Sequence, residues 1–451
     1  MKHPQSPPDL GPLLAEAADG DPERVAKILA NSRPVDRKGR YLHWDQLRRR
    51  TPPDGLTREQ WWLGVALSRR ATARPLPPVD RDGEPFRFSN VDPIQEMLHW
   101  IDQQASGQIL ADDLVTDPRS SDRYLISSLI EEAITSSQLE GASTTRAIGK
   151  ELLKSGRAPR DRSEQMIVNN FNAMQLAELM AQGTDTLTPE DVLELHRVVT
   201  EDALDDPADA GRIQTPHEER VAVYAPETDL LLHRPPPASE LPKRLAQLCA
   251  FANEELGEGF VHPVVRAVTL HFWLGYDHPF ADGNGRTARA LFYWSMLRSG
   301  YWLTQYISIS SILRKAPAQY AMSYLYTESD ENDLTYFIIY QLRVIERAIE
   351  GLKNYLTRKV REDRKLQMLL HGSPALNHRQ RALLSSAIRD QHQPFTIKAH
   401  QRQHRVAYQS ARTDLLGLED LGLFVRTKIG REFVFLAVPD LPDQIGDLAH
   451  R

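Results

Sequence analysis

Residues 278–289 read HPFADGNGRTAR. They lie between two strongly apolar segments that we expect to be helices, residues 264–276 and 288–297. Pro279 disfavours helical geometry at His278, so the first helix should end there. Gly283 and Gly285 let the backbone turn tightly and approach a ligand closely. The stretch therefore predicts a tight loop between two buried helices.

The residue types in this loop predict phosphate chemistry. A helix that begins near Asn284 directs its free N–H groups at the loop, and such a helix end binds phosphate. Arg286 and Arg289 lie three apart, so they project from one face and can grip a polyphosphate together. Asp282 is a suitable magnesium ligand, and His278 can accept a proton from an attacking hydroxyl. Singly, a histidine at a helix end or a solvated arginine is common, but the joint order and spacing favour a phosphoryl- or nucleotidyl-transfer site.

The stretch matches, without a gap, the signature HPF-x-D/E-G-N-G/K-R-x-x-R of the Fic family, which the chain therefore resembles. The resemblance extends over roughly residues 94–370. Supporting segments are His262-Pro263 with Arg266, Ile307-Ser308-Ile309-Ser310, and Asp333-Leu334-Thr335. Fic proteins are all-α, and most known members transfer AMP from ATP to a hydroxyl side chain of a target protein. Gly285 differs from the lysine of the phosphate-transferring Doc subgroup.

The resemblance implies a role for each residue of the motif. His278 would deprotonate a Ser, Thr or Tyr hydroxyl that attacks the α-phosphate of ATP. Asp282 would hold Mg²⁺, the three residues Gly283, Asn284 and Gly285 would cradle the phosphates, and Arg286 with Arg289 would stabilise the pyrophosphate charge. The same site could instead remove AMP from a modified target, as some relatives do.

A second motif lies upstream, where residues 136–141 read SSQLEG and fit the family's self-inhibition pattern S/T-x-x-x-E-G/N. Gly141 should end a helix that begins near Asp122. Ser136 then lies inside that helix and Glu140 in its last turn, where the carboxylate could pair with Arg289 and disturb ATP binding. The motif is short, so a surface glutamate is the alternative, but its position ahead of a complete Fic motif implies the self-inhibited class.

We expect a mainly α fold with three parts: an N-terminal helical extension (1–93), a Fic domain with its inhibitory helix (94–372) and a winged helix-turn-helix domain (373–451). Helices are predicted near 94–103, 122–138, 145–154 and 162–182, and a capped one begins at Thr188. Residues 75–85, rich in proline and charge, resemble a linker. The alternation at 220–232 predicts a β-hairpin. In Fic proteins a hairpin flap here pins the target's extended segment.

The C-terminal prediction depends on three capped helices and a hairpin. Asn377 and Thr396 should cap the first two helices, residues 408–421 form the third, and strands follow at 424–427 and 432–436. Ser410 to Leu415 resemble the recognition helix of DeoR-like repressors. Basic residues outnumber acidic ones between 376 and 431, which suits DNA. Winged helices also dock proteins, so both partners stay open.

Composition limits the remaining options. The chain has 451 residues and a net charge of −6, which favours no polyanion for the whole molecule. The single cysteine, Cys249, excludes an internal disulfide, and no apolar run reaches membrane-spanning length. We therefore expect a cytoplasmic adenylyltransferase that uses ATP and Mg²⁺, with a homodimer possible by analogy. The rival from another class is a DNA-binding regulator that senses ATP.

Overall fold

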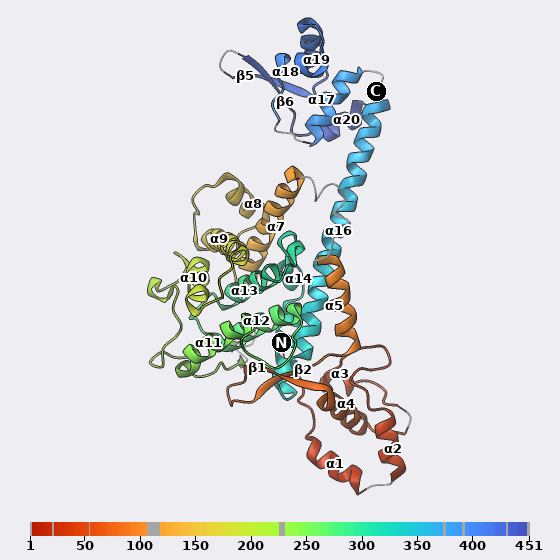
Figure 1. Ribbon diagram of the computed structural model, residues 1–451, viewed down its shortest axis with the longest axis vertical. Coiled ribbons are helices and arrows are strands. Elements are labelled where there is room, and N and C mark those ends of the chain that lie inside the picture. The colour runs from red at the N-terminus through yellow and green to blue at the C-terminus, as the bar shows by residue number, and fades with distance from the viewer. Residues whose placement is uncertain are drawn as a thin grey trace. The chain divides into compact units, whose positions relative to one another are not determined.

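The computed structural model describes residues 2–19, 22–53, 55–105, 118–224, 231–372, 376–389, 393–429 and 432–448. The chain divides into two compact units, residues 1–352 and 353–451, so the N-terminal extension belongs to the same unit as most of the expected Fic region. The fold is mainly helical, and its described strands pair as separate antiparallel hairpins (Figure 1). The division into three domains stays a prediction.

The N-terminal extension builds a small helical core. Its helices are α1 (Leu10–Ala18), α2 (Pro22–Ala30), α3 (Trp44–Leu47) and α4 (Arg58–Thr72). Trp44 and Trp62 pack against each other in the centre of this core. A capping box begins α4: the Gln60 backbone N–H donates to the Thr57 hydroxyl, and the Thr57 N–H donates to the Gln60 side chain.

The expectation of a linker at residues 75–85 is wrong. Strand β1 (Ala73–Val79) pairs antiparallel with β2 (Pro85–Ser89). Leu76, Phe86 and Phe88 are buried, so a few apolar side chains outweigh the prolines and charges around them. The prolines are tolerated because β1 lies at the edge of a two-stranded sheet.

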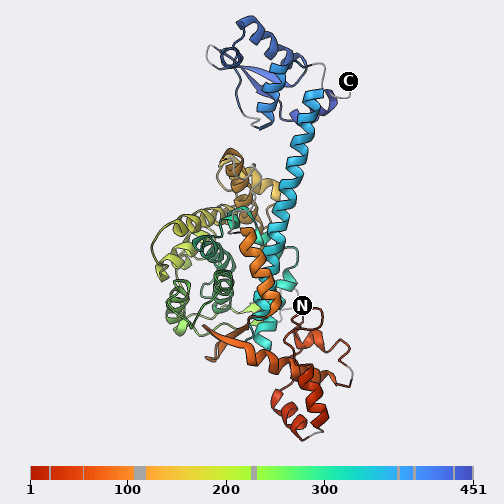
Figure 2. The ribbon, with the colours of Figure 1, turned by 45° about the vertical axis from the view of Figure 1, so that its right-hand side comes forward.

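The rest of unit 1 is a helical bundle around α12 and α13, which pack against each other (Figure 2). Nearly every residue of these two helices is buried. The elements in chain order are α5 (Asp92–Ala105), α7 (Pro118–Leu139), α8 (Arg146–Ser155), α9 (Arg162–Gln182), α10 (Pro189–Thr200), η1 (Pro207–Asp209), β3 (Val223–Tyr224), β4 (Leu231–His233), η2 (Ala238–Glu240), α11 (Leu241–Ala252), α12 (Pro263–Asp277), α13 (Asn284–Arg298), η3 (Trp302–Tyr306), α14 (Ile309–Leu313), α15 (Pro317–Ser329) and α16 (Thr335–Gly372), which continues into unit 2.

These elements confirm the helices predicted for this region, including the one capped at Thr188. The hairpin predicted at 220–232 is also present as β3 and β4, although its turn at 225–230 lies outside the described residues. None of the described helices combines the length and apolar character needed to cross a bilayer.

A buried arginine connects the N-terminal extension to α16. Arg69 of α4 donates to the Tyr336 hydroxyl at 2.6 Å and to the Leu42 carbonyl at 3.0 Å. Its guanidinium lies 3.6 Å from the centroid of the Tyr41 ring. The Tyr41 hydroxyl in turn donates to Asp333. Burial of such a charge is stable only with acceptors in place, so the extension is fixed on the bundle.

Unit 2 has its own apolar core, which includes Leu384, Leu415, Leu418 and Phe435. Asn377 and Thr396 cap the first two helices, as predicted. The elements are α17 (His378–Arg389), α18 (Ile397–His404), α19 (Tyr408–Asp420), β5 (Phe424–Ile429), β6 (Glu432–Ala437) and α20 (Leu441–Leu448). Three helices followed by an antiparallel hairpin are the order expected for a winged helix.

Candidate active site

The loop that joins α12 to α13 has two left-handed residues. His278 ends α12 with φ 45° and ψ 54°, and Gly283 precedes α13 with φ 83°. A Cβ atom at Gly283 would lie 2.7 Å from a methyl carbon of Thr200, so a side chain there has neither a comfortable conformation nor space. The chain therefore reverses within a few residues and directs both helix ends at one place.

Asn284 closes this loop with its side chain. Its Oδ1 accepts from the Phe280 N–H at 2.9 Å, and its Nδ2 donates to the Phe280 carbonyl at 2.8 Å. Phe280 is fully buried. The side-chain amide that we expected to touch phosphate is thus engaged within the loop. The first-turn backbone N–H groups are then the donors left for an anion.

His196 of α10 packs against the loop and hydrogen-bonds to it. Nothing in the sequence indicated this role. Its ring stacks on Phe280 with 3.7 Å between ring centroids. Its Nδ1 accepts from the Gly211 N–H, so Nε2 carries the proton and donates to the Asp282 carbonyl at 2.9 Å. Burial lowers the pKa of His196 to about 4, which keeps the ring neutral.

Asp282 is the carboxylate suited to a cation. Its side chain is 42% exposed, its Oδ1 accepts from the Gly283 N–H, and its Oδ2 lies 3.3 Å from Arg162. Among the described residues no cluster of three or more His, Cys, Asp or Glu could hold a metal alone. Magnesium at nucleotide sites needs only one or two carboxylates plus phosphate oxygens, so the position fits that ion.

The two motif arginines are both buried but lie in different surroundings. Arg286 donates to the Val199 carbonyl at 3.1 Å and lies 3.5 Å from Asp282, and its Nε has no partner among the described residues. Burial lowers the pKa of the Arg286 guanidinium. Such an unsatisfied buried donor favours an incoming anion.

Arg289 is held by the end of α7. Its Nε donates to the Ser136 hydroxyl at 2.8 Å, and its NH2 group donates to the Ser136 carbonyl at 3.1 Å and to Glu140 Oε1 at 2.9 Å. Gly141 follows with φ 94° and ends the helical path. The residues of the upstream motif and of the loop motif are therefore brought together.

The Glu140 carboxylate also lies against the N-terminal end of α13. A Cβ atom built on Gly285 would lie 2.2 Å from Glu140 Oε1. The carboxylate thus lies against the backbone of the first turn, at the positive end of the helix dipole, where an anion binds favourably. A carboxylate occupies the place where a phosphate is expected.

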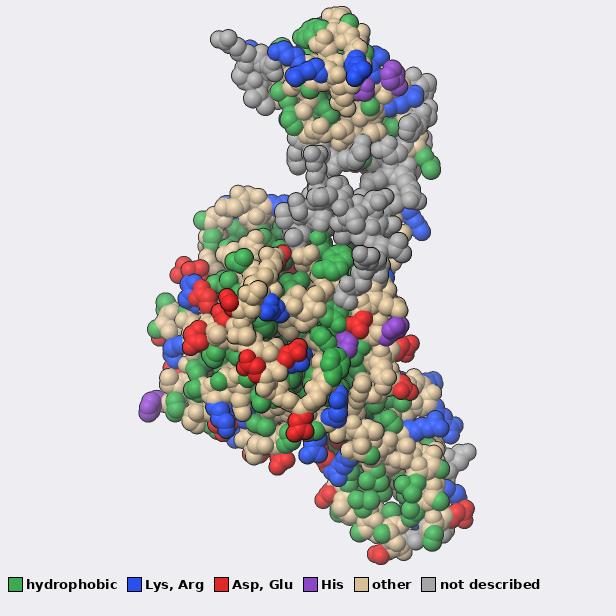
Figure 3. Space-filling model, in the orientation of Figure 1, with side chains coloured by type: hydrophobic (Ala, Val, Ile, Leu, Met, Phe, Trp, Pro, Cys, Tyr) green, Lys and Arg blue, Asp and Glu red, His purple; other side chains and the backbone are tan. Residues whose placement is uncertain are grey.

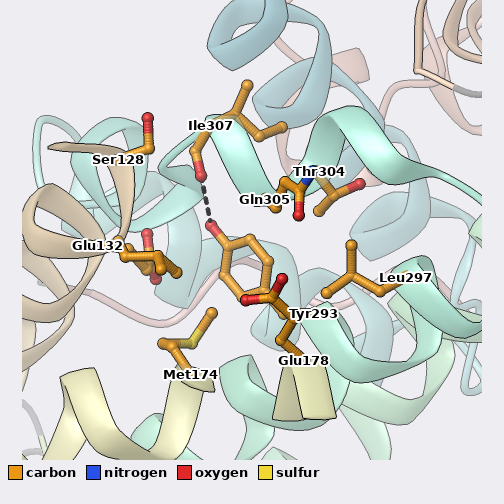
Figure 4. A pocket seen from close by; sticks show the side chains of 10 residues that line it. Ser128, Glu132, Met174, Glu178, Tyr293, Leu297, Thr304, Gln305 and Ile307 are labelled. Carbon is orange, nitrogen blue, oxygen red and sulfur yellow. Dashed lines mark hydrogen bonds between the residues drawn. The ribbon is translucent and has the colours of Figure 1, made fainter. Parts of the chain in front are cut away.

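Helix α7 rests on a buried polar support (Figure 4). Glu132 is 1% exposed and accepts hydrogen bonds from the Ser308 hydroxyl at 2.7 Å and from the Ser310 N–H at 3.0 Å. Figure 4 shows Glu132 beside Tyr293, whose hydroxyl donates to the Ile307 carbonyl at 3.2 Å. The cavity between them has about 10 Å³, the room of a single water molecule.

The segment that leads into the hairpin donates hydrogen bonds to three consecutive backbone carbonyls where α12 ends and the motif begins. Arg220 donates to the carbonyls of Asp277 at 2.7 Å and His278 at 3.1 Å, and to Pro236 beyond the hairpin at 2.9 Å. The Gln214 backbone N–H donates to the Pro279 carbonyl at 2.8 Å. Sequence analysis missed this clamp, because a lone arginine 58 positions before its partner has no local signal.

The comparisons with known proteins agree with this geometry. Residues 186–296 match the sequence profile of the Fic/DOC family. These residues form a Fic domain. The chain is 27% identical over 269 residues to "Protein adenylyltransferase Fic" of Nematostella vectensis, covering 57% of this chain and 56% of that protein. It is 30% identical over 171 residues to "Protein adenylyltransferase fic-1" of Caenorhabditis elegans, covering 38% of this chain and 31% of that one.

A Fic family protein of Desulfovibrio desulfuricans G20 has a similar fold. Its TM-score is 0.52 at 18% sequence identity, covering 78% of this chain and 98% of the other. The chain spans about half or less of the length of the two sequence relatives above, so they show the Fic domain rather than the activity of the whole protein.

The protonation of His278 provides a first test of the site. Burial lowers its pKa to about 4, and the nearby His233 contributes to the shift. We expect the imidazole to stay neutral at pH 6 in the folded protein, in histidine-selective NMR spectra with His278→Gln to assign the signal. In urea the pKa of the same ring should be about 6.5. Protonation near that value in the folded chain would contradict the geometry.

Proposed function

We propose that the Fic domain transfers AMP from ATP to a hydroxyl side chain of a target protein. The observation that supports this most is the single loop that carries a neutral histidine, a half-exposed carboxylate and a phosphate-binding helix end. The relatives named as adenylyltransferases support the same reaction.

In the proposed reaction His278 takes the proton from the target hydroxyl. The hydroxyl oxygen forms a bond to the α-phosphorus, the bond from that phosphorus to the bridging oxygen breaks, and pyrophosphate leaves. The N–H groups of Asn284 and Gly285 and the guanidinium groups of Arg286 and Arg289 stabilise the phosphate charge. Asp282 would hold Mg²⁺, which when bound neutralises charge on the phosphates.

We propose further that the resting site is inhibited by Glu140. Its carboxylate accepts a hydrogen bond from Arg289 and lies against Gly285. It would therefore repel and displace a phosphate group that binds to both residues. The buried support of Glu132 holds the whole helix in this position. Release requires movement of the α7 end, away from Arg289.

For the C-terminal unit we propose DNA binding through α19. Its residues Gln409, Arg412 and Thr413 are exposed, whereas Leu415 and Leu418 on the other side are buried. Figure 3 shows Lys, Arg and His side chains on this unit. An exposed helix with a basic and an amide side chain, followed by a hairpin, is suited to the major groove.

Removal of Glu140 should activate the enzyme. We expect Glu140→Gly to modify itself with AMP at least about tenfold faster than the native chain, because a charged hydrogen bond of ~1.5–3 kcal/mol no longer opposes ATP. Intact-mass analysis after incubation with ATP and Mg²⁺ measures this. Glu151→Ala, which changes an exposed residue of α8, is the control and should behave as the native chain. Added His278→Ala should abolish the gain, and persistence of AMP transfer without His278 would refute its role.

Arg220 should act as a positioning residue for His278. In the Glu140→Gly background we expect Arg220→Met to lower kcat by roughly 10- to 100-fold with little change in KM for ATP, because a small misplacement of the base suffices. Arg234→Met, an exposed arginine directly after β4, is the control. An equal decrease of kcat in both variants, or a change in KM for ATP without a decrease of kcat, would be evidence against this role of Arg220.

The DNA proposal has a salt-dependent test. We expect the full chain to bind duplex DNA in gel shifts, with Arg412→Glu weakening it by about tenfold and lowering the slope of affinity against salt. Arg361→Glu, an exposed arginine on α16, changes the charge equally and should have little effect. Indistinguishable affinities for the two variants would leave protein docking as the use of α19.

A further inference from the structure

A basic hollow lies in the N-terminal extension, apart from both motifs of the active site. It has a volume of about 450 Å³ and lies between the turn at residues 33–40, the segment at 50–53 and the side chain of Trp61. Its basic lining residues are Arg33, Arg37, Lys38, Arg40 and Arg50. This concentration of positive charge contrasts with the net charge of −6 of the whole chain.

The carboxylate among the described lining residues is already engaged. Asp36, the acidic residue in the lining, accepts from Arg40 Nε at 2.8 Å and from the N–H groups of Lys38 and Arg40 at 2.9 Å each. The neighbouring Asp45 pairs with Arg48 and Arg49 outside the hollow. The described carboxylates of the extension therefore leave the charge of the other lining cations without a partner inside the hollow.

Four lining side chains have no acceptor among the residues that the structure describes: those of Arg33, Arg37, Lys38 and Arg50. The Nε of Arg50 is in addition buried from solvent and unpaired. A buried donor without a partner costs about 1–3 kcal/mol, so this position favours a ligand with an acceptor. Phosphate oxygens are the acceptors that arginine forks match best.

The hollow is preformed. The Asp36 N–H donates to the Arg40 carbonyl at 3.0 Å, and the Gly39 N–H donates to the Asp36 carbonyl at 2.9 Å, which closes the turn. The Ser32 hydroxyl ties the start of this segment to the Gly64 carbonyl of α4 at 2.6 Å. The backbone of the turn that carries these cations is thereby fixed beside the hollow, so a ligand does not have to order the backbone when it binds.

One wall is apolar. Val35, Pro52, Pro53 and the half-buried ring of Trp61 provide it. A planar ring stacks favourably on tryptophan. The volume lies in the range of small-molecule sites, ~300–1,000 Å³. The cations surround one concavity, whereas tracking of a nucleic-acid backbone requires a positive groove along the surface.

We propose that this hollow binds a nucleoside polyphosphate, with the phosphates among Arg33, Arg37, Lys38 and Arg50 and the base on the wall of Trp61. The site is independent of the proposed AMP transfer, since none of its residues belongs to the motifs at 136–141 or 278–289. It assigns a ligand class to the N-terminal extension.

The test is calorimetric titration of the full chain at low ionic strength with three probes: inorganic tripolyphosphate, GTP and a single-stranded oligonucleotide. We expect tripolyphosphate to bind, and GTP to bind more tightly because of its base. Arg37→Glu should weaken both by about tenfold or more, the loss of a charged hydrogen bond. Arg24→Glu, an equally exposed arginine on α2, is the matched control and should retain native affinity.

A second variant separates the base from the phosphates. Trp61→Ala should reduce GTP affinity towards that of tripolyphosphate and leave tripolyphosphate unchanged. The proposal is overturned if Arg37→Glu and Arg24→Glu bind equally, since binding would then belong to the end of α13. Tighter binding of the oligonucleotide than of GTP, lost in Arg37→Glu, would also overturn it in favour of nucleic acid.

Discussion

The side chain of Arg289 is 1% exposed, and a buried guanidinium is stable only when its N–H groups have acceptors. The end of α7 supplies them: the hydroxyl and carbonyl of Ser136 and the carboxylate of Glu140. The other chemistry that fits this place is a phosphate, because the first turn of α13 offers free N–H groups and a positive dipole end. A nucleotide could therefore replace the carboxylate without leaving the arginine unpaired. Through this one side chain the position of α7 would, in the proposed function, be coupled to the binding of phosphate.

The opposite side of the loop is constrained by its backbone. The C-terminal end of a helix leaves carbonyl groups without intrahelical partners, and a buried one needs a donor from elsewhere. Arg220 and Gln214 donate to the carbonyls of residues 277–279, while Asn284 pairs with Phe280 across the loop. Arg220 also donates to the Pro236 carbonyl, so the segments before and after the hairpin are both connected to the backbone of His278. In the proposed function, a target segment that pairs with the hairpin would therefore be aligned with His278.

Charge is distributed unevenly over the chain. The central bundle carries most of the acidic side chains visible in Figure 3, whereas the hollow of the N-terminal extension is basic and unit 2 exposes Arg402, Arg405, Arg412, Arg426 and Lys428. The electric fields of these charges act locally, since salt screens the interaction between exposed charges beyond about 10 Å. Each basic region therefore defines its own ligand preference, even though the net charge of the molecule is negative.

Local patterns in the sequence determined a large part of this protein. Proline and glycine set the loop at 278–289, side-chain caps set the starts of α4, α10 and α18, and helical spacing of apolar residues set the bundle. The likeness of the two motifs to the Fic family also led to the Glu140–Arg289 pair. Tertiary structure alone decided the roles of His196, Gln214 and Arg220, the strand at residues 73–79 and the gathering of Arg50 with the turn at 33–40. The physical reason is that these contacts join residues that are far apart in the sequence and belong to no common periodic pattern. They form only when packing of the chain brings a donor and an acceptor from distant segments together.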